Sequence, residues 1–222
     1  SCSLVGSEMC IRDSVQRVCR PDHTFRGFQG QIESGVVSVG DDIITLPSGE
    51  SAKVKSILVG DKDSQSAQEG QPVTIQLDKE VDVSRGCVLS SGTTLPVSKS
   101  LTATILWMDD AELTVGKDYI VKIGTKQVLG VLKNIQYKID VNTGNFLPAN
   151  GLSKNEIAVC DIGLQEAVVI DEFAKHKTLG ELILIDRISN MTSACGVVTD
   201  SSAYDNKEVK CAFINANDKI NI

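Results

Sequence analysis

The chain has 222 residues, of which 41% are hydrophobic, 23% charged and 4% aromatic. This length allows one large or two small domains, whose cores must be built mainly from Val, Ile and Leu. The net charge of −7 argues against a protein that wraps nucleic acid through its phosphates, although a local basic patch stays compatible with it. No apolar run approaches the ~20 residues of a membrane-spanning helix.

Seven cysteines are spread along the chain, and none forms a Cys-x-x-Cys pair. Zinc sites and disulfide frameworks usually show tighter spacing, and an odd count leaves one thiol unpaired. We therefore expect reduced thiols and a cytoplasmic location.

Residues 1–14 (SCSLVGSEMCIRDS) show no periodicity and no apolar core of a signal peptide. They resemble a translated sequencing-adaptor sequence, and a frayed native terminus is the alternative. We predict a non-native or disordered leader that contributes nothing to stability.

From residue 15 onward, short β-favouring runs alternate with turn signals. Glycines recur through residues 25–58, and glycine can adopt the positive φ that tight turns and bulges require. Residues 72–77 alternate cleanly, with Val73, Ile75 and Leu77 on one face. A first β-barrel is predicted over residues 15–97, with a polar loop at 60–70 and strands at 42–46, 52–58, 72–77 and 88–90.

Residues 95–98 are predicted to be a short connection, after which a second series of strands begins. No window of ~11 residues has a helical period. A second barrel is predicted over residues 98–200, and residues 201–222 are expected to be a tail or a truncated extension. The fold class is therefore all-β, with two tandem β-barrels. Strands of the second barrel are expected at 101–107, 119–123, 127–132, 135–139, 156–164, 168–170, 182–186 and 196–199.

Six short runs go beyond generic barrel patterning. They are RPDHTFRGFQG (20–30), DVSRG (82–86), WMD (107–109), IDVNTG (139–144), NEI (155–157) and LIDRISN (184–190). In this order they resemble the large, GTP-binding subunit of bacterial sulfate adenylyltransferase, a relative of elongation factor Tu. The resemblance covers residues 15–199 and implies that subunit's second and third domains, a translation-factor-like barrel followed by an elongation factor Tu C-terminal-like barrel.

Two positions depart from the pattern of this family. Cys87 stands where the family usually has an acidic residue, and Ala194 where it has a glycine-rich run. Ala194 is expected to need a backbone angle that glycine takes more easily.

The resemblance implies an enzyme that makes adenosine 5′-phosphosulfate and pyrophosphate from ATP and sulfate, driven by GTP hydrolysis. Its implied partners are a small catalytic subunit and a GTPase domain that holds GTP and Mg²⁺. This chain has no Gly-x-x-x-x-Gly-Lys-Ser/Thr run: Gly116-Lys117-Asp118 is only a fragment, and residues 206–209 lack the Asp of a guanine-reading motif. We expect the chain alone to be inactive, without cofactor, nucleic-acid or membrane binding.

Other candidate sites favour structural interpretations. His23 and His176 lack the spacing of metal ligands. Asp109-Asp110 fits a solvated loop better than an acid/base pair, and Asp140 with Asn142 fits a turn held by side-chain hydrogen bonds. No catalytic or metal-binding residue is therefore predicted.

Five polar residues lie beside glycine-marked bends in the runs that carry the resemblance. One interpretation is a polar interface that docks the first barrel on the GTPase domain or the small subunit; an internal turn network is the other. Two alternatives stay open for the whole chain: a translation elongation factor-like barrel pair that binds tRNA or ribosomal RNA, and a stand-alone scaffold. The five candidates are Arg20, Asp22, Arg26, Asp82 and Arg85.

Overall fold

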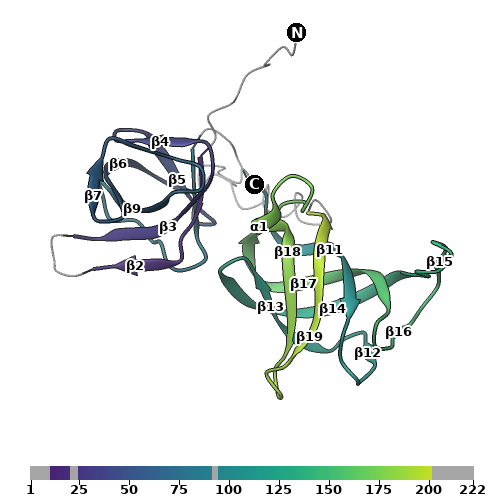
Figure 1. The fold of residues 1–222 in the computed structure, drawn as a ribbon. Coiled ribbons are helices and arrows are strands. Elements are labelled where there is room, and N and C mark those ends of the chain that lie inside the picture. The colour runs from purple at the N-terminus through teal and green to yellow at the C-terminus, as the bar shows by residue number, and fades with distance from the viewer. Residues whose placement is uncertain (1–10, 21–24, 92–94, 202–222) are drawn as a thin grey trace, which may run out of the picture. The chain divides into compact units, whose positions relative to one another are not determined.

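The computed structural model describes residues 11–20, 25–91 and 95–201, and these are almost entirely β-structure (Figure 1). Of these described residues, 61% lie in strands and 2% in a helix, which confirms the all-β prediction. Two compact units divide the chain, with their main boundary between Val97 and Ser98. The segments Lys122–Val128 and Ala167–Val169 group with the first unit, although their strands pair within the second.

The first unit contains ten strands, and six of them form a closed antiparallel barrel. The pairing runs β1-β10-β5-β6-β9-β3 and returns from β3 to β1. Outside this ring, β2 pairs with β3, β7 pairs with β6, and β4 and β8 form a separate ribbon. The strands are β1 (Ile11–Ser14), β2 (Arg17–Cys19), β3 (Gly27–Ser34), β4 (Val36–Ser38), β5 (Asp42–Leu46), β6 (Glu50–Val59), β7 (Lys62–Ser64), β8 (Ser66–Gln68), β9 (Pro72–Leu77) and β10 (Val88–Ser91).

The strand that closes this barrel lies in the predicted leader. Ser14 is paired with Val88 of β10, and Asp13 is paired with both Leu89 of β10 and Ile32 of β3. The prediction of a disordered leader is therefore wrong for Ile11–Ser14, while residues 1–10 lie outside the described part. Four residues are too few to show an alternating pattern, and their pairing uses backbone groups that every sequence carries.

The core of the first barrel follows the predicted alternation in β9. Val73, Ile75 and Leu77 are buried, and Ile75 is fully enclosed together with Phe28 of β3 and Ile43 of β5. The predicted polar loop at 60–70 is wrong in part, because β7 and β8 lie within it. Both strands are three residues long and mostly polar, with Ala67 as their one buried apolar side chain, so no apolar alternation marked them.

The second unit is also a closed six-stranded barrel. The pairing runs β13-β18-β19-β11-β17-β14 and returns from β14 to β13; β15 extends the sheet beyond β14, and β12 pairs with β16. The elements are β11 (Val97–Trp107), β12 (Leu113–Thr114), β13 (Asp118–Ile123), β14 (Lys126–Ile139), β15 (Phe146–Leu147), β16 (Gly151–Leu152), β17 (Ile157–Val169), α1 (Lys177–Gly180), β18 (Glu181–Asp186) and β19 (Thr192–Asp200).

Two long strands replace pairs of shorter predicted ones. The segments 127–132 and 135–139 form the single strand β14, whose register against β17 shifts between Leu132 and Asn134 and again between Ile135 and Tyr137. Such bulges bend a strand without ending it. Likewise, 156–164 and 168–170 fall in or beside the single strand β17. The predicted connection at 95–98 overlaps the start of β11.

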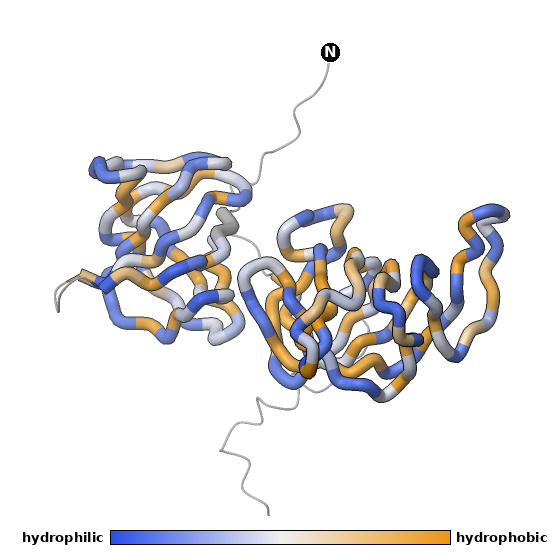
Figure 2. Tube along the Cα trace, turned by 60° about the horizontal axis from the view of Figure 1, so that its bottom comes forward, coloured by the Kyte–Doolittle hydropathy of each residue, from blue (hydrophilic) through white to orange (hydrophobic). Residues whose placement is uncertain are grey.

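The second core is organised around two aromatic side chains. Trp107 of β11 and Tyr119 of β13 are both 1% exposed, and their rings meet edge to face with centroids 6.0 Å apart. Figure 2 shows hydrophobic and hydrophilic residues alternating along the strands of both units, as the pleat of a half-buried strand requires. Ala194 pairs with Trp107 inside β19 and has no positive φ, so its expected backbone strain is wrong.

The described residues contain one helix, the four-residue α1. No helix in this part of the chain is long and apolar enough to cross a membrane.

Candidate interface on the first barrel and polar cluster of the second

Two of the predicted interface residues border one small recess on the first barrel. Arg20 and Arg26 line it together with Phe28, Lys55 and residues 76–80, and its volume is about 180 Å³. Arg20 Nη2 lies 3.5 Å from Glu80 Oε1, and both side chains are more than half exposed. Exposed pairs of this kind stabilise a fold by only ~0–1 kcal/mol, so Arg20 stays available at the surface.

Arg26 has an internal role in the fold. Its Nη2 donates a hydrogen bond to the carbonyl oxygen of Val83 at 3.3 Å, and its guanidinium lies 5.4 Å from the ring centroid of buried Phe28. Arg26 therefore joins the start of β3 to the segment that precedes β10. This geometry favours the turn-network interpretation for Arg26.

The other candidates lie elsewhere. The backbone N–H of Asp82 donates to Glu50 Oε2 at 3.3 Å, while Asp82 itself is exposed. Arg85 is exposed and lines a different recess of about 530 Å³, together with Arg17, Asp61 and residues 72–74. Asp22 lies outside the described residues. The structure thus places Arg20 and Arg26 at one recess and Arg85 at another, while Asp82 lines neither of them. An interface role stays a prediction for these residues.

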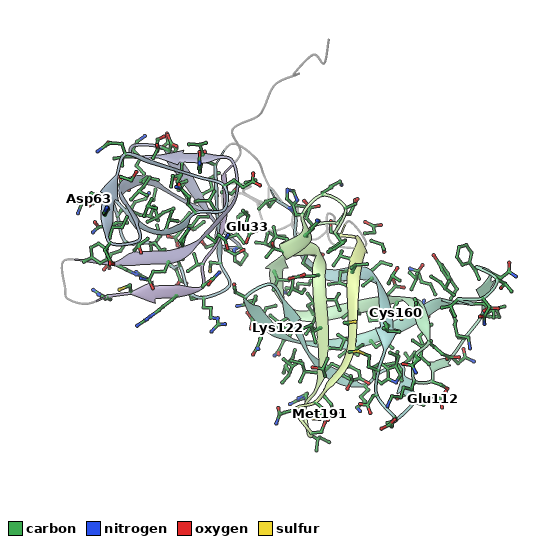
Figure 3. The ribbon with its side chains drawn as sticks, viewed as in Figure 1. Glu33, Asp63, Glu112, Lys122, Cys160 and Met191 are labelled. Atoms are coloured by element: carbon green, nitrogen blue, oxygen red, sulfur yellow. The ribbon has the colours of Figure 1, made fainter. Side chains whose placement is uncertain are left out.

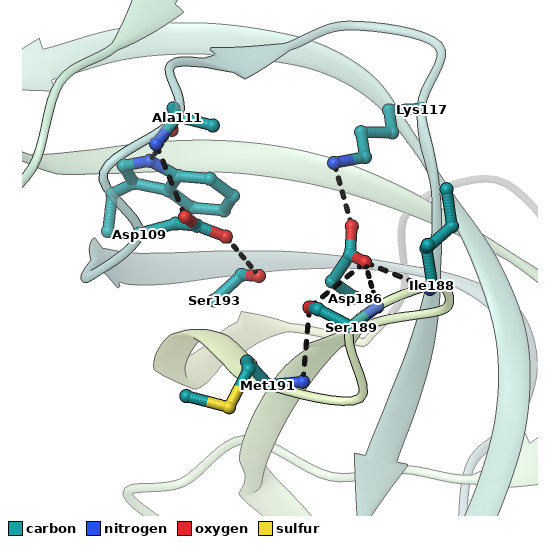
Figure 4. Close-up of polar contacts among 9 residues, drawn as sticks. Asp109, Ala111, Lys117, Asp186, Ile188, Ser189, Met191 and Ser193 are labelled. Atoms are coloured by element: carbon teal, nitrogen blue, oxygen red, sulfur yellow. Dashed lines mark hydrogen bonds and ion pairs between the residues drawn. The ribbon is translucent and has the colours of Figure 1, made fainter.

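A polar cluster occupies one end of the second barrel, at the turn between β18 and β19 (Figure 4). Asp186, the last residue of β18, accepts hydrogen bonds from the N–H groups of Ile188 and Ser189, each at 2.9 Å. Its other carboxylate oxygen lies 2.8 Å from Lys117 Nζ. The Lys117 ammonium, followed by the two N–H groups, holds the pKa of Asp186 well below its usual value, and Asp186 raises the pKa of Lys117.

Asp109 fixes the neighbouring loop in the same way. It accepts hydrogen bonds from Ser193 Oγ at 2.8 Å and from the N–H of Ala111 at 3.2 Å. Ser193 is the larger cause of its lowered pKa. The carbonyl of Ala111 in turn accepts a hydrogen bond from Trp107 Nε1 at 2.8 Å. Asp109 and Asp110 lie in a loop with exposed residues, as expected, and Asp109 in addition bonds that loop to β19.

Tyr119 completes the cluster from the side of the core. Its ring lies 5.3 Å from Lys117 Nζ, and burial raises the pKa of its hydroxyl. That hydroxyl oxygen has no hydrogen-bond partner among the described residues. The carboxylates of Asp186 and Asp109 are occupied by N–H, hydroxyl and ammonium donors, so the cluster is suited to holding turns rather than to acid/base chemistry.

Asp186 lies within the LIDRISN run, and no role was predicted for it. An Asp followed by Ser and Asn is typical of turns in which a side chain binds the backbone, and that signal was available. The same signal was used correctly for Asp140, whose carboxylate accepts from the N–H of Asn142 at 2.9 Å and from Thr143 Oγ1 at 2.8 Å.

His176 is a satisfied histidine, as its lack of ligand spacing suggested. Its Nδ1 lies 2.5 Å from Oδ2 of Asp171, which is 5% exposed. His23 falls outside the described residues. Among the residues that the structure describes, no group of three or more His, Cys, Asp or Glu side chains is placed to hold a metal ion.

Four of the cysteines lie in the described part of the chain, and all four are free thiols: Cys19, Cys87, Cys160 and Cys195. Burial raises the pKa of Cys160 to about 12, so this thiol stays protonated and unreactive in the folded barrel.

A recess of about 550 Å³ on the second barrel is lined by β11, β14 and β17. Gly163 lies beneath Lys133, and a Cβ at that glycine would come within 2.2 Å of Lys133 Cε. The stem of the exposed Lys133 side chain therefore packs over Gly163.

Comparison with proteins of known structure defines the fold class. The two tandem six-stranded barrels share their fold with part of sup35: sup35 complexed with GDP superimposes with a TM-score of 0.79 at 20% identity, covering 86% of this chain and 47% of sup35. Elongation factor SelB from Methanococcus maripaludis gives 0.67 at 21% identity, covering 87% of this chain and 43% of SelB. Residues 100–199 match the family model described as GTP-eEF1A C-terminal domain-like.

Within that class, the chain is homologous to subunit 1 of sulfate adenylyltransferase, which confirms the resemblance. The protein of that name from Francisella tularensis subsp. novicida (strain U112) is 40% identical over 199 residues, 89% of this chain and 42% of the relative. Its counterpart in Teredinibacter turnerae (strain ATCC 39867 / T7901) is 41% identical over 194 residues, 87% of this chain and 42% of the relative. The chain thus spans about two fifths of the length of these relatives.

Proposed function

We propose that this chain is the non-catalytic barrel portion of a GTP-driven sulfate adenylyltransferase. The parent enzyme would make adenosine 5′-phosphosulfate and pyrophosphate from ATP and sulfate in the cytoplasm. The observation that carries the proposal is 40% identity to sulfate adenylyltransferase subunit 1 over 89% of the chain. GTP and Mg²⁺ would bind in a GTPase domain, because the phosphate-cradling run that they require is absent from these 222 residues.

The barrels would couple the GTPase domain to the small catalytic subunit. Closed barrels move as rigid bodies, and rotation of rigid domains about an interface is a common way to pass on a nucleotide state. Of the predicted interface residues, Arg20 and Arg85 are exposed and suited to docking. Arg26 is instead hydrogen-bonded to the Val83 carbonyl and packs on the Phe28 ring.

The test is a fusion of Ile11–Ser201 behind the GTPase domain of a bacterial relative, with the small subunit added. The fusion begins at Ile11 because β1 closes the first barrel. We expect GTP-dependent release of pyrophosphate from ATP and sulfate, while the 222-residue chain alone shows no heat of binding with a non-hydrolysable GTP analogue. A folded fusion that releases no pyrophosphate would contradict the proposal.

Arg85→Ala in this fusion tests the interface, with Lys62→Ala on the exposed strand β7 as the matched control. Loss of GTP dependence with Arg85→Ala alone, at unchanged melting temperature, would place Arg85 at a docking surface. Retention of the chain on an RNA column at low salt would instead favour the translation-factor alternative.

A further inference from the structure

A short edge strand and its turn project from one end of the second barrel. β14 continues to Ile139 and stays paired with β17 on one edge, where Ile139 faces Ile157; on its other edge the chain returns as β15, with Lys138 paired to Leu147 and Ile139 paired to Phe146. Figure 1 shows β15 at the outer end of this barrel, away from β18 and β19, and Figure 3 shows the side chains along it. We call residues 137–147 the β14–β15 arm.

The arm exposes apolar side chains at its outer end. Phe146 and Val141 are each 67% exposed, and Leu147 is 40% exposed. The Phe146 ring packs against Tyr137, with centroids 4.7 Å apart, as expected for diagonal neighbours on one face of a ribbon. Isolated exposed apolar residues are ordinary, but a group of them on one projecting element is typical of an interaction site.

The turn at the end of the arm is rigid before any partner binds. The Asp140 carboxylate holds the N–H of Asn142 and the hydroxyl of Thr143, and these bonds lower the pKa of Asp140. The backbone of Asp140 is also bonded to Gly144 and Asn145, at 2.7 and 2.9 Å. An element that is already ordered loses little conformational entropy on binding, so its exposed apolar area contributes more fully to affinity.

The lack of unpaired charge on the arm favours a protein partner over a nucleic acid or a membrane. Asp140 is the only charged residue from 139 to 150, and its carboxylate is used inside the turn. At the base, Lys138 Nζ is paired with Glu156 Oε1 at 2.7 Å. Phosphate backbones and anionic membranes are recognised by unpaired Lys and Arg, which the arm lacks. Its neutral apolar and amide surface fits an uncharged recess on a protein.

We propose that the β14–β15 arm docks into an apolar recess on the small catalytic subunit, with Phe146 and Val141 as its anchors. This inference rests on the proposed function, which supplies that partner. A few buried anchors contribute most of the affinity of a protein interface, and large aromatic residues are enriched among them.

The test measures binding of the 222-residue chain to the purified small subunit of the Francisella enzyme by calorimetry. Val141→Asp and Phe146→Ser should each raise the Kd at least tenfold, which corresponds to about 1.4 kcal/mol. Val141→Asp leaves the contact between Phe146 and Tyr137 in place, so it tests docking without disturbing the ribbon. Ile188→Asp is the matched control, because Ile188 is 91% exposed on another turn of the same barrel; its Kd should stay within about twofold of wild type.

Each result bears on the docking role. Wild-type affinity in a folded Val141→Asp variant would overturn it while leaving the proposed function intact, and so would equal weakening by Ile188→Asp. Self-association that Val141→Asp abolishes would show that the arm binds a second copy, which also overturns it. Absence of any binding by the wild-type chain would overturn the docking role, whereas the proposed function is judged separately by pyrophosphate release from the fusion.

Discussion

Removing residues 1–14 should unfold the first barrel, because these residues include the strand that closes it. Ile11–Ser14 is paired at four positions with β10 and at two positions with β3. With about one backbone hydrogen bond per paired position, each worth about 0.5–1.5 kcal/mol net, the loss is about 3–9 kcal/mol. A whole domain is stable by only about 5–15 kcal/mol. The truncation also leaves β10 and β3 as unpaired edges that invite aggregation.

The chain offers an internal control for this experiment. Its single tryptophan, Trp107, is buried in the second barrel, so tryptophan fluorescence reports that barrel while far-ultraviolet circular dichroism reports both. In urea, the truncated chain should lose a large part of the circular dichroism transition and keep the fluorescence transition. Asp13→Pro, which removes one N–H from a strand paired on both sides, should act in the same direction. An unchanged circular dichroism midpoint after truncation would refute the closing role of β1.

Three further predictions concern the second barrel, and urea unfolding followed by tryptophan fluorescence tests each. His176→Ala should lower the free energy of unfolding by about 1–3 kcal/mol, because it leaves the buried Asp171 carboxylate without one of its partners; wild-type stability would show that water replaces the imidazole. Gly196→Ala should cost about 1–3 kcal/mol, since the new Cβ would lie 2.6 Å from a carbonyl oxygen of β11; a neutral result would mean that the strands separate freely. The pKa of Asp186 is lowered in the folded barrel, so its contribution to the free energy of unfolding is present above the unfolded pKa of about 3.9 and is lost as the pH falls through the folded pKa. Asp186→Asn should therefore make the free energy of unfolding fall less steeply in acid. An unchanged pH profile would contradict this assignment.

Much of the strand pattern could be predicted because it is local. The bounds of β5 and β9 agree with the predicted segments. In β9 this follows from the alternation of apolar and polar residues, which the pleat of a single strand produces. The break predicted between residues 132 and 135 was wrong because polar residues mark a bulge as well as a turn. Only the pairing of β14 with β17 shows that the strand continues.

For the candidate interface, the sequence predicted which residue types are involved but not which of them are exposed. Arg26 and Arg85 both lie beside a glycine, and nothing in that pattern separates them. In the structure, Arg26 contacts Val83 and Phe28, whereas Arg85 lines another recess at the surface. The difference depends on which side chain folds back over the core.

The sequence by itself determined the all-β class, the turn at Asp140 and the relation to sulfate adenylyltransferase subunit 1, because each is encoded in short runs of neighbouring residues. The tertiary structure alone decided that Ile11–Ser14 closes the first barrel by pairing with β3 and with β10, which is more than 70 positions away, and that Phe146 is exposed on the second. Strand pairing and exposure depend on which distant segments bond to the same backbone groups and cover the same apolar surface. A local sequence pattern does not contain that information.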